Sequence, residues 1–147
     1  MIPYCQSHGI TLLTYGTVCG GLLSDRYLGM PEPGPAALNT ASLRKYKQMI
    51  DAWGGWDLFQ QLLQVLKGIA AKHDASIANV AMRYVLDRPA VAGVIVGARL
   101  GLSDNRADNA RVFDFTLDGD DLERIHAVTA GARDLVAIIG DCGDEYR

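Results

Sequence analysis

The chain has 147 residues and a formal net charge of −3, with 49% hydrophobic and 21% charged residues. This composition is that of an ordinary globular protein and excludes a disordered chain. The weak negative charge, without a basic block, argues against nucleic acid as a partner. The longest apolar runs fall well short of the roughly 20 residues that span a bilayer, so we expect no membrane protein. The N-terminal MIPYC lacks the charged and apolar segments of a secretory signal.

The three cysteines, Cys5, Cys19 and Cys142, are an odd number at irregular spacing. This pattern favours free thiols in a reducing compartment, so we expect a cytoplasmic location. Cys5 and His8 have the C-x-x-H spacing of a zinc ligand pair, but no second pair completes a tetrahedral site. We therefore predict no metal.

The chain begins with a helix end and a strand. The segment YCQSHG is typical of a last helical turn closed by Gly9. Residues 11–15 are predicted to form a short buried strand, because apolar and β-branched residues fill GITLLTYG. From Thr17 to about residue 52 we predict a long irregular loop, since proline and glycine interrupt any regular period.

Two helices and a second strand come next. In WDLFQQLLQVLKGIAAKH, apolar residues recur every three or four positions, which predicts an amphipathic helix with Asp57 in its first turn. Ser76 is expected to cap a second helix, IANVAMRYVLDR, which Pro89 ends. The run AVAGVIVGA is apolar on both faces, so residues 91–96 are predicted to form a parallel strand buried on both sides.

The last third of the chain is predicted to be helical. Ser103 is expected to cap a helix that runs to about Val112. Asp118, Asp120 and Asp121 begin a further helix, where acidic side chains suit the positive end of the helix dipole, so we interpret them as a capping cluster. The three histidines are isolated in the sequence, and we expect them to be structural or exposed.

The order of elements predicts an α/β fold with two parallel strands joined by a helical crossover. A strand that is apolar on both faces needs neighbours on both sides, and two strands cannot supply them. We therefore expect helices on one face of the pair and an under-packed opposite face. An open edge beside such a face favours self-association.

Three blocks of the sequence resemble, in order, the C-terminal part of the aldo-keto reductases: HGITLLTYGTVCGGLL, IANVAMRYVLDRP and VIVGARLGLSDNRADN. That family consists of NADP(H)-dependent (β/α)8 TIM barrels that reduce aldehydes and ketones. The resemblance implies that residues 1–147 form one domain equivalent to the C-terminal part of such a barrel, about two βα units plus C-terminal helices. It identifies the two strands as the seventh and eighth of the barrel.

The resemblance also implies an NADP(H) site that begins at the end of the first strand. Tyr15 takes the position of an aromatic residue that stacks on the nicotinamide. Gly16 and Thr17 follow where the family holds the pyrophosphate, with the Thr17 hydroxyl in place of a serine. Without the resemblance, a tyrosine at a strand end is more often a packing residue.

The second part of the implied site follows the second strand. Gly97 and Arg99 come where the family binds the adenosine 2′-phosphate, and Arg99 is the expected partner of the phosphate. Asn105, Asp108 and Asn109 match positions that contact the phosphate and the adenine. A helix N-terminus with charge-assisted donors explains such a site physically. The residues alone also allow Arg99 to pair with a nearby carboxylate and the other three to form a solvated helix face.

The family's catalytic Asp, Tyr, Lys and His lie in the first half of the barrel, and no residue of this chain matches their motifs. We therefore expect no catalytic residue here and, for the chain alone, cofactor binding at most. Its full-length relatives imply a nucleotide cofactor and a small carbonyl substrate as partners. Two alternatives stay open: a truncated, non-catalytic interaction module, or the product of a partial gene model.

Overall fold

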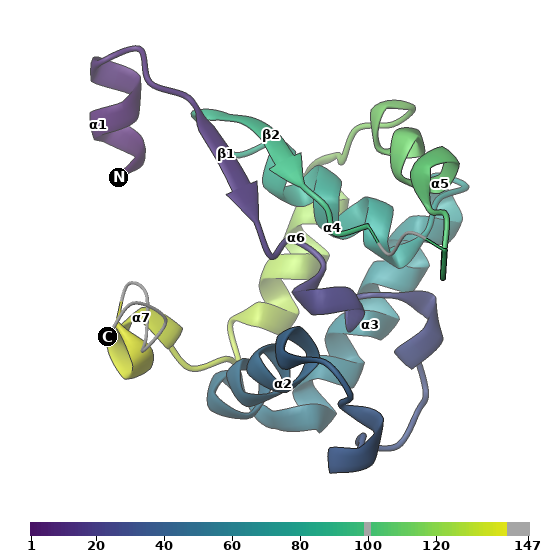
Figure 1. The fold of residues 1–147 in the computed structure, drawn as a ribbon. Helices are drawn as coiled ribbons and strands as arrows, with labels where there is room; N and C mark the ends of the chain where they lie inside the picture. The colour runs from purple at the N-terminus through teal and green to yellow at the C-terminus, as the bar shows by residue number, and fades with distance from the viewer. Residues whose placement is uncertain (99–100, 141–147) are drawn as a thin grey trace.

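The computed structural model describes residues 1–98 and 101–140, which form a mixed α/β structure with two parallel strands and seven α-helices. The strands are β1 (Leu12–Tyr15) and β2 (Val91–Ile95). The helices are α1 (Ile2–Ser7), α2 (Ala41–Trp53), α3 (Gly55–Lys72), α4 (Ile77–Leu86), α5 (Arg106–Ala110), α6 (Gly119–Thr129) and α7 (Leu135–Ile139). Figure 1 shows α1 set apart from the other helices, beyond the start of β1.

The two strands lie side by side and parallel, as the sequence predicts. Leu13 lies opposite Gly93, and Tyr15 lies opposite Ile95. The crossover between the strands contains α2, α3 and α4. Because the strands are parallel, the segments that follow β1 and β2 both leave the sheet at the same end.

The prediction of a loop that extends to about residue 52 is wrong beyond Thr40. Helix α2 begins at Ala41, and the Thr40 side chain caps it by accepting a hydrogen bond from the Leu43 amide at 3.1 Å. The proline- and glycine-rich segment before Thr40 contains short 3-10 turns at Cys19–Gly21, Asp25–Tyr27 and Pro35–Ala37. A threonine cap directly after such a segment is a weak local signal, which explains the error.

Helix α3 is the centre of the core and packs against α2, α4 and α6. Its amphipathic stripe is confirmed, because Leu63 and Ile69 are fully buried. The predicted Ser76 cap of α4 is also confirmed, since the Ser76 hydroxyl accepts a hydrogen bond from the Asn79 amide at 3.2 Å. The buried apolar cluster consists of Leu22, Ile50, Trp56, Phe59, Leu63, Leu66, Ile69, Ala70, Ile77, Val80 and Ile125.

Two predictions of burial are wrong: that residues 11–15 form a buried strand, and that residues 91–96 form a strand buried on both sides. Every residue of β1 and β2 is half-buried or exposed. Leu13, Tyr15 and Ile95 have 69%, 61% and 56% of their surfaces exposed. Helix α4 contacts β2. The two-stranded sheet therefore leaves one apolar surface open, which agrees with the under-packed face expected from the sequence.

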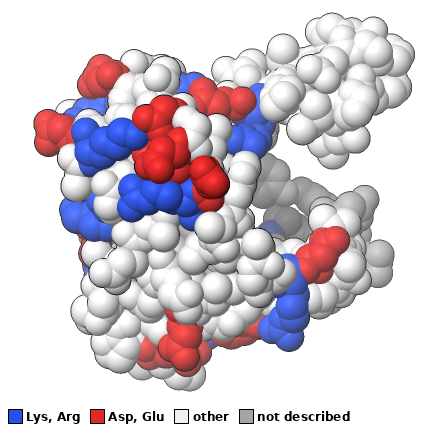
Figure 2. All heavy atoms as spheres, turned by 180° about the vertical axis from the view of Figure 1, so that it is seen from behind, with Lys and Arg blue, Asp and Glu red and all other residues white. Residues whose placement is uncertain are grey.

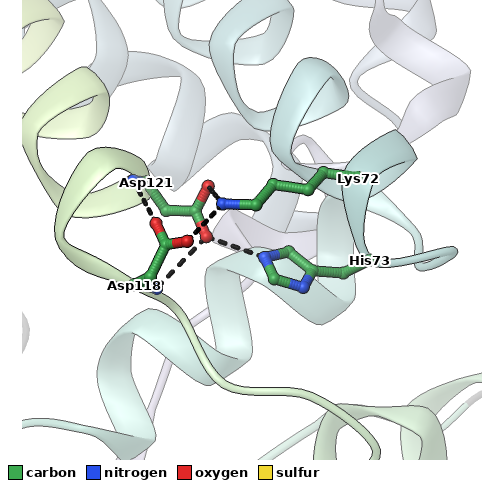
Figure 3. A network of polar contacts seen from close by, with 4 residues as sticks. All are labelled: Lys72, His73, Asp118 and Asp121. Carbon is green, nitrogen blue, oxygen red and sulfur yellow. Dashed lines mark hydrogen bonds and ion pairs between the residues drawn. The ribbon is translucent and has the colours of Figure 1, made fainter.

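Four side chains tie the end of α3 to the start of α6 (Figure 3). Asp118 and Asp121 form a capping box, which confirms the interpretation of this acidic cluster. Lys72 Nζ lies 2.5 Å from Asp118 Oδ2 and 3.0 Å from Asp121 Oδ1. His73 Nε2 lies 2.7 Å from Asp121 Oδ2, so His73 has a structural role, although it is not isolated as its sequence position suggested.

The surface of the described residues mixes both signs of charge. Figure 2 shows acidic and basic side chains interspersed in one large cluster, while much of the same face is uncharged. Within the part of the chain that the structure describes, no helix has the length and apolar character needed to cross a membrane.

Candidate functional site

The ends of β1 and β2 bring the first predicted site residue to an open surface. Tyr15 is the last residue of β1 and lies opposite Ile95, the last residue of β2. The Tyr15 side chain is largely exposed, on the open face of the sheet. An exposed aromatic ring at this place offers a flat surface on which a planar ligand ring can stack.

Gly16 follows in a conformation that favours glycine. Its φ is +77°, in the left-handed region. A Cβ atom at this position would lie 2.3 Å from the Tyr46 hydroxyl oxygen, because α2 folds back over the end of β1. Backbone geometry and the close approach of Tyr46 both require that residue 16 has no side chain.

Thr17 is buried, and its hydroxyl oxygen has no hydrogen-bond partner among the described residues. A buried polar atom without a partner costs roughly 1–3 kcal/mol. A phosphate oxygen that accepted a bond from this hydroxyl would remove that cost.

An apolar cavity of about 310 Å³ lies next to Thr17 and was not predicted from the sequence. Side chains of α2, α3, α4 and α6 line it, among them Trp53, Leu62 and Tyr84. Cys19 also faces it, and burial raises the pKa of this thiol to about 11. The cavity offers no charged group to a phosphate, so we do not assign it to a nucleotide. Side chains of α2 form part of the cavity wall, and the sequence did not predict this helix, so the cavity was not predicted either.

The segment after β2 differs from the predicted capped helix. Gly97 is exposed just beyond the strand, whereas Arg99 lies outside the described residues. Ser103 does not cap a helix, because α5 begins only at Arg106 and spans five residues. The Asp104 carboxylate accepts a bond from the Arg106 amide at 3.1 Å, a local side-chain contact that competes with the expected cap.

The charge of Arg106 is already compensated. Its guanidinium pairs with Asp104, with Nη2 2.7 Å from Oδ2 and Nε 2.9 Å from Oδ1. These hydrogen bonds from Arg106 lower the pKa of the Asp104 carboxyl. Asn105 precedes the helix but makes no side-chain cap bond and is exposed. Among the described residues of this segment, Arg106 is thus a poor candidate for the phosphate partner.

Asp108 is held by α4 rather than solvated. Its Oδ2 atom accepts hydrogen bonds from Ser76 Oγ and from Asn79 Nδ2, both at 3.0 Å. Asn79 is completely buried. Asn109 is half-buried, and its amide donates to the Asn105 carbonyl at 2.7 Å. A contact between residues 29 positions apart has no local sequence signal, so Ser76 and Asn79 were not predicted as part of this site.

Comparison with known proteins decides the family. The sequence pattern of the aldo/keto reductase family matches residues 1–130. The chain belongs to the aldo/keto reductase family. The match contains β1, β2 and α5, and therefore every predicted site residue from Tyr15 to Asn109.

Three curated relatives show how much of a complete protein this chain represents. Flagellar radial spoke protein 5 of Chlamydomonas reinhardtii is 40% identical over 90 residues, which is 59% of this chain and 17% of that protein. Aldose reductase C of Dictyostelium discoideum is 32% identical over 80 residues, 54% of this chain and 23% of the relative. Dihydrodiol dehydrogenase 3 of Bos taurus is 28% identical over 147 residues, 99% of this chain and 36% of the relative. The chain thus spans little more than a third of these relatives at most.

Proposed function

We propose that this chain is the NADP(H)-binding, C-terminal part of an aldo/keto reductase barrel. The observation that carries the proposal is the parallel register in which Tyr15 and Ile95 end β1 and β2 side by side. Ligands of (β/α)8 barrels bind at the C-terminal ends of the strands, where the following loops meet. Such barrels usually need about 250 residues, so β1 and β2 represent two neighbouring strands of a larger sheet.

The residues after β1 contact the reactive half of the cofactor in this proposal. Tyr15 stacks on the nicotinamide ring, Gly16 lets the backbone approach, and the Thr17 hydroxyl donates a hydrogen bond to the pyrophosphate. The bound cofactor supplies the hydride for carbonyl reduction. The exposed ring of Tyr15 and the unsatisfied hydroxyl of Thr17 support these roles.

The residues after β2 contact the adenosine half. Gly97 leaves room for the backbone to turn, and Arg99 pairs with the 2′-phosphate through charge-assisted bonds. Asp108 accepts a hydrogen bond from the adenine amino group, while Asn105 and Asn109 contribute polar contacts around the ribose and phosphate. The pairing of Arg106 with Asp104 supports Arg99 as the phosphate partner, since Arg106 is the other cation between Gly97 and Asn109 and already has a carboxylate partner.

We do not assign a catalytic residue to this chain. Carbonyl reduction needs a proton donor beside the hydride acceptor, and the chain has no residue in the family positions that supply one. The chain therefore binds cofactor without reducing aldehydes or ketones by itself, and the carbonyl substrate belongs to the complete barrel. We place this function in the cytoplasm, because the thiols of Cys5 and Cys19 are free.

A second candidate function is a non-catalytic interaction module. The open apolar face formed by Leu13, Tyr15 and Ile95 favours it, because exposed apolar surfaces mark interaction sites. The similarity to a protein named as a flagellar radial spoke component is compatible with this alternative. Cofactor binding discriminates between the two functions, since an interaction module does not require it.

Titration of the full chain with NADPH tests the proposal. Tyr15→Ala should weaken binding by about three- to tenfold, which is the range expected for the loss of one stacking contact. Tyr4→Ala is a matched control, because Tyr4 is also 61% exposed but lies on α1. We expect no NADPH oxidation with a generic aldehyde. A parent chain that does not bind NADPH, or equal effects of the two substitutions, would contradict the proposed function.

A further inference from the structure

The apolar cavity of about 310 Å³ lies between helices, apart from the open face of the sheet. Helices α2, α3, α4 and α6 form most of its wall, and none of the described residues of β1 or β2 contributes to it. Trp53, Leu62 and Val85 line the cavity and are only half-buried, so solvent reaches it and a small molecule can enter. Pockets for small ligands typically have volumes of about 300–1,000 Å³. The cavity is thus large enough for one compact ligand.

The wall of the cavity determines the body of such a ligand. None of the described residues that line it carries a charge, and Trp53 and Phe59 offer aromatic rings. Atoms that border an empty space lack dispersion partners, so an apolar molecule that fills the space is favoured. An apolar cavity of about 150 Å³ in a protein interior can hold benzene. A cavity of about twice that volume suits a molecule of two fused rings.

The wall also contains one buried polar atom without a partner. Thr17 lines the cavity and is only 9% exposed, and its Oγ1 atom has no hydrogen-bond partner among the described residues. Thr129 lines the cavity too, but its hydroxyl donates to the His126 carbonyl at 3.2 Å. A hydroxyl donates one hydrogen bond and accepts two. Thr17 can therefore bond to the hydroxyl of a ligand even when it donates to a pyrophosphate.

We propose that this cavity binds a small two-ring alcohol or phenol, whose hydroxyl pairs with Thr17 Oγ1 and whose rings pack against Trp53 and Phe59. The apolar wall favours the rings, and the unpartnered hydroxyl of Thr17 selects a ligand with a polar group at one end. The ligand is uncharged, because the wall has no charged side chain among the described residues to compensate an ion. This site goes beyond the cofactor site of the proposed function and does not depend on it.

The test uses 2-naphthol and naphthalene, which share the two rings and differ by one hydroxyl. Equilibrium dialysis with the full chain measures the Kd of each. Leu62→Trp places a larger side chain in the cavity, and Gln64→Trp is the matched control, because Gln64 is an exposed residue of α3. Thr17→Val removes the hydroxyl and keeps a side chain of similar shape. Circular dichroism shows whether each variant keeps the helix content of the parent.

The parent chain and Gln64→Trp should bind both ligands, and Leu62→Trp should bind them about tenfold more weakly or not at all, because its side chain fills the cavity. Thr17→Val should shift the ratio of the two Kd values by about two- to tenfold in favour of naphthalene, as expected for the loss of one hydrogen bond. A parent that binds neither ligand, unchanged binding in Leu62→Trp, or an unchanged ratio in Thr17→Val would overturn the proposal. Neither ligand contains a nucleotide, so these outcomes are separate from failure of the proposed function.

Discussion

His73 Nε2 lies 2.7 Å from Asp121 Oδ2, and this contact joins the end of α3 to the start of α6 (Figure 3). The same carboxylate accepts a bond from Lys72 and closes the capping box with Asp118. Asp121 is completely buried, so its charge is compensated entirely by these neighbours. Asp121 is therefore one of the contacts that hold the start of α6 against the end of α3.

Replacement of Asp121 by Ala should destabilise the chain by roughly 3 kcal/mol, because it breaks a buried ion pair and a helix cap together. Asp120→Ala is the control, since Asp120 lies in the same helical turn but is exposed. It should change the free energy of unfolding by less than about 0.5 kcal/mol. Urea unfolding at neutral pH measures both values, and similar effects of the two substitutions would contradict the assignment.

Acid should weaken the same network over a defined range of pH. Hydrogen bonds from Lys72 lower the pKa of Asp118 from 3.8 to about 2. Burial raises the pKa of Asp121, but bonds from His73 and Lys72 more than offset it, and the net pKa is lowered. Both groups thus stabilise the fold above the unfolded-state pKa, and this stability is lost as the pH falls through the folded pKa.

We expect the free energy of unfolding to fall between about pH 4 and pH 2, as measured by urea unfolding at successive pH values. Asp118→Asn should flatten this dependence, because the substituted side chain does not titrate. An unchanged slope in Asp118→Asn would show that other carboxyl groups determine the acid sensitivity.

Gly16→Ala should destabilise the chain by about 2–4 kcal/mol, from the left-handed backbone and the clash with Tyr46 combined. Gly34→Ala provides the control, because Gly34 has a φ of −72° and a Cβ atom added there would meet no described atom within 4 Å. That substitution should be neutral or slightly stabilising. Thermal unfolding of the two variants checks the contrast, and a stable Gly16→Ala variant would refute the close approach of α2 to the end of β1.

The purified chain should self-associate through the open face of the sheet. Leu13→Lys should reduce association, because it places a charge in the centre of this face. Val136→Lys is a control of equal exposure, since Val136 is 68% exposed and lies on α7, away from the strands in Figure 1. Sedimentation velocity over a range of micromolar concentrations measures the effect. A compact monomer of the parent chain at all concentrations would contradict this prediction.

Local patterns in the sequence were sufficient for most of the fold. The caps at Ser76 and Asp118 are hydrogen bonds between residues three positions apart, so the sequence indicates them directly. The apolar stripe of α3 is likewise a repeat of three or four positions. The cap expected at Ser103 failed because the neighbouring Asp104 captured the Arg106 amide instead. Two acceptors this close compete, and composition alone does not decide between them.

The sequence predicted the positions in the fold only of those candidate residues that lie next to a strand. Tyr15 ends β1, and Gly16 and Thr17 follow it directly, so their placement at this end of the sheet follows from the strand itself. The bonds from Ser76 and Asn79 to Asp108, and the approach of Tyr46 to Gly16, join residues about 30 positions apart. These contacts depend on how α2, α4 and α5 pack, which hydrophobic periodicity does not specify.

The most direct test of the NADP(H) site is calorimetric titration of the parent, Arg99→Ala and Arg106→Ala chains with NADPH and NADH. An Arg–phosphate contact is worth about 1.5–3 kcal/mol, so the parent should bind NADPH at least tenfold more tightly than NADH. Arg99→Ala should erase most of this preference. Arg106→Ala should retain it, because Arg106 is paired with Asp104. Equal affinity of the parent chain for the two cofactors would contradict the assignment of the segment after β2 to the 2′-phosphate of NADP(H).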